Sequence, residues 1–336
     1  MALLDVRNLS KYFPIHGGIL KREVGRVYAV DNVSFQLNEG ETLGVVGESG
    51  CGKSTLARSI IRLYEPSAGT VTFDGQDFTA LEANDLKNAR RSMQMIFQDP
   101  YASLNPRMSV GKILEEPFLL HGIGNQIERR RKIEELLNLV GLRPDAVHRY
   151  PHEFSGGQRQ RIGIARALAL DPKLVICDEA VSALDVSIQA QVLNLLVELQ
   201  ERLGLTYLFI SHDLSVIKFI SDRVAVMYLG RIVELASSDT LFEGPKHPYT
   251  QALLASLPVP DPSHTPSEEM LEGDVPSPSS PPSGCYFHTR CRYVTDECKT
   301  TPPRLIPMPD DPRHQVACHL TDPNSQSYRS GGKNAL

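Results

Sequence analysis

Short apolar runs and amphipathic stretches alternate along most of the chain. Four apolar runs have the length and composition of buried strands: residues 41–46, 93–97, 174–177 and 207–210. Between them, apolar residues recur at helical spacing in residues 55–64, 133–140, 155–170 and 188–203. The first of these helices is expected to bury Leu56, Ile60 and Leu63 on one face. Strands that alternate with helices in this way predict an α/β fold with a mainly parallel sheet.

Other parts of the pattern depart from this alternation. Residues 3–9 and 33–37 read as strands on either side of a glycine-containing excursion, and they predict an antiparallel N-terminal subdomain. Residues 224–228 and 231–234 read as two strands on either side of a Leu-Gly pair, and this pattern predicts a hairpin. From about residue 99 to 170 the pattern is helical, and we expect an inserted helical subdomain there.

Composition excludes some classes of protein. The 336 residues carry a net charge of only −5 with both signs mixed, so there is no electrostatic case for binding nucleic acid. No apolar stretch is long enough to span a membrane, and the N-terminus does not resemble a secretion signal. We therefore expect a protein that stays in the cytosol.

A glycine-rich segment lies between the first apolar run and the first predicted helix. Residues 47–54 read GESGCGKS and fit the pattern G-x-x-x-x-G-K-S/T of a phosphate-binding loop. In such a loop, backbone N–H groups and the helix N-terminus surround the phosphates. Lys53 would reach the β- and γ-phosphates, and the Ser54 hydroxyl would bind Mg²⁺. The predicted nucleotide-binding residues here are Gly47, Ser49, Gly50, Cys51, Gly52, Lys53, Ser54 and Thr55.

Two acidic residues end the third apolar run. A carboxylate at Asp178, at the end of a buried strand, can hold Mg²⁺ through water. Glu179 follows directly and is the candidate general base for the attacking water. An acidic pair at a strand end is common in α/β proteins, so this interpretation depends on the phosphate loop.

A second possible anion site begins a later helix. Ser155, Gly156, Gly157 and Gln158 place glycines at a helix N-terminus, where backbone N–H groups attract anions. Because the chain already has one phosphate loop, a monomer would have no use for a second.

Together, these motifs resemble those of the ATP-binding-cassette (ABC) ATPases over residues 1 to about 257. The resemblance implies that Gln98 touches Mg²⁺ and water, and that His212 contacts the γ-phosphate and orients Glu179. It implies that residues 155–158 cover the ATP of a partner subunit in a head-to-tail dimer. Phe13, or the neighbouring Tyr12, resembles the aromatic residue that stacks on adenine.

The sequence departs from the commonest family pattern at some positions. Phe154 precedes the Ser-Gly-Gly-Gln segment where leucine is more usual, and Ala180-Val181 stand where many relatives have Pro-Thr. Residues 182–185 resemble the loop through which the two ATP sites communicate. None of the departures falls on a residue that carries chemistry.

The C-terminal part resembles one branch of the family. Residues 247–254, HPYTQALL, look like a motif of ATPases that energise dipeptide, oligopeptide and nickel importers. This resemblance implies two membrane permease subunits, a second ATPase subunit that is a paralogue, an external substrate-binding protein, and a place on the cytoplasmic face of the inner membrane. Residues 247–254 could form a docking helix or simply close the domain. A soluble ABC ATPase that serves nucleic acid or translation is the rival interpretation.

The cysteines are unevenly distributed. Cys51 and Cys177 read as small buried fillers. Four more, Cys285, Cys291, Cys298 and Cys318, are spaced C-x5-C-x6-C-x19-C in a Pro-rich segment with too few apolar residues for a core. A cytosolic location argues against disulfides, which leaves a metal site, and the spacing does not choose between zinc and iron–sulfur. The resemblance to peptide importers implies a [4Fe–4S] cluster. Zinc, with help from His288, His314 or His319, and free thiols are the alternatives.

The sequence therefore predicts an organisation in several parts. Residues 1–257 form the ABC ATPase domain, with the helical insert at about 99–170. A Pro/Ser-rich linker follows at 258–283, because it lacks the apolar residues to fold alone. The Cys-rich extension occupies 284–322, and 323–336 form a tail.

Overall fold

The computed structural model describes residues 2–18, 21–256 and 273–329, which fall into two compact units. The helical unit contains Leu37–Thr42 and Phe73–Ser211 with the N-terminal residues up to Leu4. The phosphate-loop unit contains Asp5–Gln36, Leu43–Thr72 and the described residues from His212 onward. Most of the predicted linker (258–272) and the end of the predicted tail (330–336) lie outside the described residues.

The helical unit is built on the parallel strands β6 (Met93–Ile96), β7 (Leu174–Asp178) and β8 (Thr206–Ile210). β7 lies in the middle and pairs with both neighbours in register. Every residue of β7 and β8 is buried, as expected for parallel strands covered on both faces. The predicted mainly parallel α/β arrangement is confirmed here.

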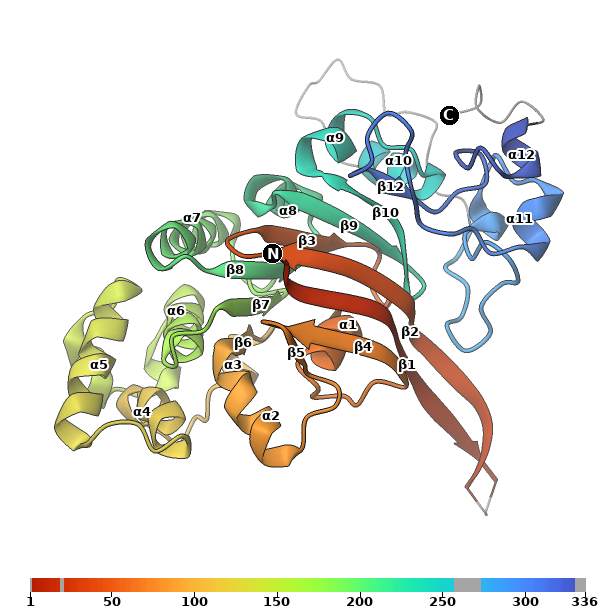
Figure 1. The fold of residues 1–336 in the computed structure, drawn as a ribbon. Helices are drawn as coiled ribbons and strands as arrows, with labels where there is room; N and C mark the ends of the chain where they lie inside the picture. Colours follow the sequence, from red (N-terminus) through yellow and green to blue (C-terminus); the bar gives the residue numbers. More distant parts are fainter. Residues whose placement is uncertain (1, 19–20, 257–272, 330–336) are drawn as a thin grey trace. The chain divides into compact units, whose positions relative to one another are not determined.

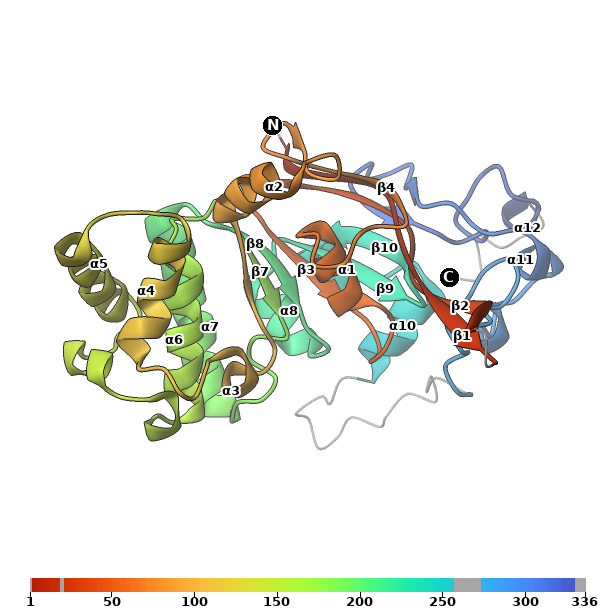
Figure 2. The same cartoon turned by 90° about the horizontal axis from the view of Figure 1, so that it is seen from below.

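Helices surround these strands and extend beyond them (Figures 1 and 2). They are α2 (Ala83–Ala89), α3 (Pro100–Ser103), α4 (Val110–Leu120), α5 (Gln126–Leu139), α6 (Gly156–Leu168) and α7 (Val186–Leu203). α4, α5 and α6 pack on one another in the region predicted to hold the helical insert. α5 begins with a reciprocal capping box between Asn125 and Glu128, and it buries Ile133, Leu136 and Leu137 as its periodicity predicts.

A long antiparallel hairpin begins the phosphate-loop unit. β1 (Ala2–Gly17) and β2 (Arg22–Asn38) run side by side almost to the turn near Gly18, and β4 (Ala68–Phe73) lies on the other side of β1 (Figure 1). The predicted antiparallel N-terminal strands at 3–9 and 33–37 are confirmed, but they are longer than predicted and take in most of the glycine-containing excursion. The strands continue because each supplies the hydrogen-bonding partner of the other, which requires no apolar alternation.

Three further strands of the phosphate-loop unit position the glycine-rich loop. β3 (Thr42–Val46) is parallel to β9 (Arg223–Tyr228), and β9 pairs antiparallel with β10 (Arg231–Ser237), so the predicted hairpin is confirmed. α1 (Lys53–Ile60) follows the loop after β3, and α8 (Leu214–Ile220) and α9 (Ser238–Glu243) belong to the same unit. Leu63 is 48% exposed, contrary to prediction, because α1 ends at Ile60 and Arg62 takes a left-handed backbone.

The C-terminal segment packs onto this sheet. Its elements are the 3-10 turn η4 (His288–Arg290), α11 (Asp296–Thr300), β11 (Ile306–Pro307), β12 (Gln315–Val316) and α12 (Gln326–Arg329). β12 pairs antiparallel with β10. The expectation that this segment lacks a core was wrong, because a few apolar residues suffice when an existing sheet supplies one side. A small cluster forms from Val316, Cys318, Leu320, Tyr293 and Met308.

A buried carboxylate ties the segment to β10. Glu234 is fully buried and accepts hydrogen bonds from His314 Nε2 at 2.7 Å and from the backbone N–H groups of Lys246 (2.7 Å) and His247 (3.0 Å). His247 caps α10 (Pro248–Ala255), since its Nδ1 accepts a hydrogen bond from the Tyr249 N–H at 3.1 Å. His247 must be neutral at Nδ1 to do this, and burial lowers its pKa to about 4 despite the nearby Glu234.

We expect His247 to make the protein less stable as the pH falls from about 6.5 to about 4. In that window the unfolded chain binds a proton at His247 that the folded chain does not bind, so stability rises with pH. His247→Asn keeps a capping acceptor and should remove a pH-dependent contribution of about 3 kcal/mol. The free energy of unfolding in urea, compared between pH 4.5 and pH 7.5 for the wild type and the variant, measures this contribution. His152→Asn, at an exposed position, is the control. An unchanged pH slope in His247→Asn would contradict the assignment.

Candidate nucleotide site

The glycine-rich loop wraps around its own lysine. Lys53 is 4% exposed, and its Nζ donates to the backbone oxygens of Gly47 (2.8 Å) and Glu48 (3.1 Å). Cys51 Sγ lies 3.8 Å from the same ammonium group. Cys51 is buried, as predicted, and burial raises the pKa of its thiol. The loop therefore holds a positive charge at the N-terminus of α1, which suits the binding of an anion.

Two glycines of the loop have no room for a side chain. A Cβ at Gly47 would overlap the backbone oxygen of Met227, and one at Gly52 would overlap that of Ala29. Gly52 also has a φ of 107°, a backbone conformation that other residues rarely adopt. The loop thus lies directly against the backbone of β9 and β2.

The segment 247–254 packs inside the phosphate-loop unit. Tyr249 is fully buried, and its hydroxyl accepts a hydrogen bond from the Glu48 N–H at 2.9 Å. Its ring packs on Tyr228 and Phe287, with centroids 4.7 and 5.4 Å away. Of the two interpretations of this segment, a helix that closes the domain agrees with the position of Tyr249.

The two candidates for adenine stacking have different surroundings. The Tyr12 hydroxyl donates to Asp31 at 2.8 Å, and the Tyr12 ring packs on Tyr28. Phe13 is half-buried and meets the Tyr64 ring edge-on at 5.4 Å. The polar bond makes Tyr12 part of the hairpin's internal network, which leaves Phe13 as the better candidate.

The helical unit brings together two predicted catalytic residues. Gln98 Nε2 donates to Glu179 Oε2 at 2.7 Å. Glu179 has a left-handed backbone with a φ of 49°, and its N–H donates to the Ile210 carbonyl at 3.0 Å. Asp178, the last residue of β7, is fully buried. A strained non-glycine residue held by a neighbouring strand is typical of a functional site.

The Ser-Gly-Gly-Gln segment begins α6 with a reciprocal cap. The Gln158 N–H donates to Ser155 Oγ at 3.4 Å, and the Ser155 N–H donates to Gln158 Oε1 at 3.1 Å. Both side chains are exposed, whereas Gly157 is buried where a Cβ would overlap Ile188. The serine and glutamine thus stabilise the helix terminus, which sequence reasoning did not anticipate.

Each unit carries its own part of the predicted site. Gln98, Asp178, Glu179 and residues 155–158 belong to the helical unit, and the phosphate loop belongs to the other. His212 is exposed and lies in the phosphate-loop unit, directly before Asp213, which caps α8.

The four late cysteines lie near one another. Burial raises the pKa of the Cys318 thiol, and the thiols of Cys285, Cys291 and Cys298 raise it further. Burial also raises the pKa of Cys285 to about 12 and that of Cys291 to about 11. The Cys285 N–H donates to the Cys298 carbonyl at 2.8 Å.

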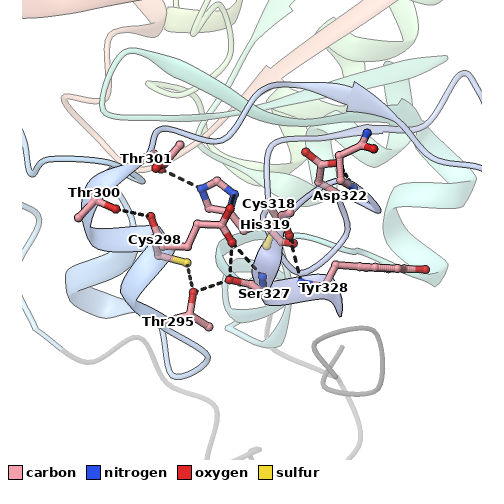
Figure 3. Close-up of polar contacts among 12 residues, drawn as sticks. Thr295, Cys298, Thr300, Thr301, Cys318, His319, Asp322, Ser327 and Tyr328 are labelled. Atoms are coloured by element: carbon pink, nitrogen blue, oxygen red, sulfur yellow. Dashed lines mark hydrogen bonds and ion pairs between the residues drawn. The ribbon is translucent and has the colours of Figure 1, made fainter. Parts of the chain in front are cut away.

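The arrangement of these cysteines does not by itself form a metal centre. Within residues 2–18, 21–256 and 273–329, no three His, Cys, Asp or Glu side chains are placed to hold one metal ion. Cys298 Sγ lies 3.2 Å from the Thr295 hydroxyl, and His319 Nε2 faces the Thr301 carbonyl at 2.8 Å (Figure 3). His314 is bonded to Glu234, and His288 Nδ1 contacts the Cys285 carbonyl. Four thiols are the ligands that a sulfur-ligated group requires, but within the described residues they do not form a metal-binding group.

Comparison with known proteins decides the family. Residues 30–182 match the family model described as ABC transporter, and residues 233–298 match that of the oligopeptide/dipeptide transporter C-terminal region. The oligopeptide transport ATP-binding protein AppF of Bacillus subtilis is 57% identical over 95% of this chain and 97% of its own length. The chain belongs to the ABC transporter ATP-binding proteins, in their oligopeptide/dipeptide branch. It is therefore an ABC-type ATPase.

Other relatives of this ABC ATPase agree with the assignment. The probable peptide ABC transporter ATP-binding protein y4tS of Sinorhizobium fredii is 55% identical over 98% of this chain and 93% of its own. A dimeric post-hydrolysis structure of the ATP-binding cassette MJ0796, bound to ADP and Pi, is 29% identical with a TM-score of 0.62. It covers 70% of this chain and 98% of its own. In the described part of this ABC ATPase, no helix is long and apolar enough to cross a membrane.

Proposed function

We propose that this ABC ATPase powers the import of peptides through a membrane transporter. The observation that carries the proposal is its similarity, over nearly the whole length, to ATP-binding proteins named for peptide transport, together with the matching C-terminal region. Peptide-binding specificity would belong to other subunits of the transporter. Import of nickel or of another small solute by the same machinery is the alternative.

ATP and Mg²⁺ would be bound mainly by the phosphate loop. Gly47 and residues 49–55 would surround the phosphates, Lys53 would neutralise their charge, and Phe13 would stack on adenine. Ser54, Gln98 and Asp178 would hold Mg²⁺, Asp178 through water. When bound, the Mg²⁺ withdraws charge from the phosphate oxygens.

Glu179 would act as the general base. It takes the proton of the water that attacks the γ-phosphate. The bond from Gln98 supports this role, because it fixes the Glu179 carboxylate through a side chain that would itself touch Mg²⁺ and water. His212 would contact the γ-phosphate and orient Glu179.

Two ATPase subunits would close head to tail around two ATP molecules. Ser155, Gly156, Gly157 and Gln158 would cover the ATP of the partner, which we propose to be a paralogue. The exposure of Ser155 and Gln158 at the N-terminus of α6 supports this role. Closure of the dimer would drive the membrane subunits, and hydrolysis would reset them.

The ATPase would lie on the cytoplasmic face of the cell membrane. There it would contact two permease subunits near residues 98–106, and these would receive peptides from an external binding protein. Tyr101, which is 58% exposed in this segment, supports a contact surface here. Bulky substitutions in residues 101–106, which leave Gln98 intact, should impair transport more than the isolated ATPase activity.

Partners can be identified directly. Purification of this chain from native membranes, followed by mass spectrometry, should recover permease subunits and a second ABC ATPase. Recovery of ribosomes or DNA-bound proteins in their place would favour the rival function in translation or nucleic acid metabolism. ATP-dependent peptide uptake by the purified complex in vesicles then separates peptides from nickel as the cargo.

Glu179→Gln should keep ATP binding and lower the rate of hydrolysis by about 10²- to 10⁴-fold, because an amide cannot accept the proton. Phosphate release measures the rate, and gel filtration with ATP and the partner subunit should show an accumulated dimer. Asp171→Asn, at an exposed acidic residue of the same unit, is the matched control. Hydrolysis near the wild-type rate would remove Glu179 as the base.

We further propose that Cys285, Cys291, Cys298 and Cys318 bind a metal centre, a [4Fe–4S] cluster in preference to zinc. The closeness of the four thiols supports this proposal. Cys₄ sites suit either centre, and iron–sulfur protein is brown and absorbs near ~400 nm.

Metal analysis of protein purified without oxygen tests the cysteine site. We expect iron and sulfide in the wild type and loss of both in Cys291→Ser, but not in Cys177→Ser, whose thiol is fully buried elsewhere. Stoichiometric zinc in colourless protein would select the alternative metal. Protein free of both metals would leave the four residues as ordinary thiols.

A further inference from the structure

In the phosphate loop, the backbone N–H, the backbone carbonyl and the side-chain carboxylate of Glu48 each make a hydrogen bond. The Glu48 N–H donates to the Tyr249 hydroxyl (2.9 Å), and its carbonyl accepts from Lys53 (3.1 Å). Its carboxylate meets the Arg290 guanidinium in a two-pronged pair, with Nη1 at 2.8 Å and Nη2 at 3.2 Å. Such bidentate pairs fix orientation as well as charge.

Arg290 reaches the loop from the Cys-rich segment, 242 residues further along the chain. It is the last residue of η4, directly before Cys291. The side chain is 5% exposed, against 26% for Glu48, and it lies 5.9 Å from the Tyr228 ring centroid. The pair is therefore largely shielded from solvent, where charges interact more strongly than at the surface.

A carboxylate in a phosphate loop is an electrostatic difficulty. Glu48 follows Gly47 in the loop, and its carbonyl accepts a hydrogen bond from the Lys53 ammonium, so its negative charge belongs to the same loop that would bind the phosphates of ATP. Like charges at short range oppose binding. Arg290 offsets the charge of Glu48 and also holds the peptide whose carbonyl orients Lys53.

We propose that Arg290 is a positioning residue for ATP binding, which acts by neutralising and orienting Glu48. The C-terminal segment thereby contributes to the nucleotide site of its own chain. The proposal needs only the ATPase activity and is independent of which solute is transported.

The consequence is a defect that a second substitution repairs. Arg290→Met keeps most of the side-chain volume but leaves the Glu48 charge without this partner, and it should raise the dissociation constant and the KM for ATP about tenfold. kcat should change less than twofold, because the lost interaction contributes equally to the bound ATP and to the transition state. Arg290→Lys, which keeps the charge but not the bidentate geometry, should be intermediate.

The double variant Glu48→Gln/Arg290→Met should return the KM to within about threefold of the wild type, because the repelling charge is gone. A purely structural role for Arg290 would not produce this rescue. The matched control is Arg313→Met, which removes an exposed arginine of the same segment that pairs with Asp311. It should leave the KM unchanged.

The experiment measures binding of a fluorescent ATP analogue, steady-state hydrolysis and thermal unfolding for the full-length chain. Arg290→Met with the wild-type affinity would overturn the proposal, as would a double variant as weak as Arg290→Met or a loss confined to kcat. If Arg290→Met does not fold, the comparison of Arg290→Lys with Glu48→Gln/Arg290→Lys gives the same test. A failure of peptide transport with normal rescue would count only against the proposed import function.

Discussion

The phosphate loop is built around contacts that leave no space for a side chain. At Gly47 and Gly52 the loop touches the carbonyl groups of Met227 and Ala29, so it cannot move without moving β9 and β2. The Gly230 N–H adds a hydrogen bond to the Cys51 carbonyl at 2.8 Å. Lys53 then bonds to carbonyls of the loop itself. A rigid loop of this kind arranges its N–H groups before the ligand arrives, which lowers the entropic cost of binding.

The C-terminal segment is part of the structure that supports this loop. β12 extends the sheet from β10, and the buried Glu234 binds His314 from the segment. Phe287 packs on Tyr228 and Tyr249, and from the same stretch Arg290 reaches Glu48. The segment is thus joined by backbone pairing, an apolar contact, the His314–Glu234 hydrogen bond and the Arg290–Glu48 ion pair. The influence on nucleotide binding that we propose for it follows from these contacts.

Features with a local signature could be predicted from the sequence. The phosphate loop, the buried parallel strands, the face of α5 and the β9–β10 hairpin each depend on residues a few positions apart. The errors have local causes as well. Leu63 continues a helical period, but α1 ends before it, and periodicity does not reveal where a helix stops. The ends of β1 and β2 nearest their connecting turn carry no apolar alternation, so nothing in the sequence pattern there predicts strands.

The sequence alone established the fold class, the family and the kinds of residue at the nucleotide site, because these are encoded in short motifs. It could not show that Glu179 has a left-handed backbone against Ile210, or that Gln98 bonds to it. Nor did any signal connect Glu48 with Arg290 or with Tyr249, since these residues lie far apart in the chain. Such contacts depend on how completed strands and turns pack together. Chain folding brings distant charges within 3 Å, and no local pattern records that distance.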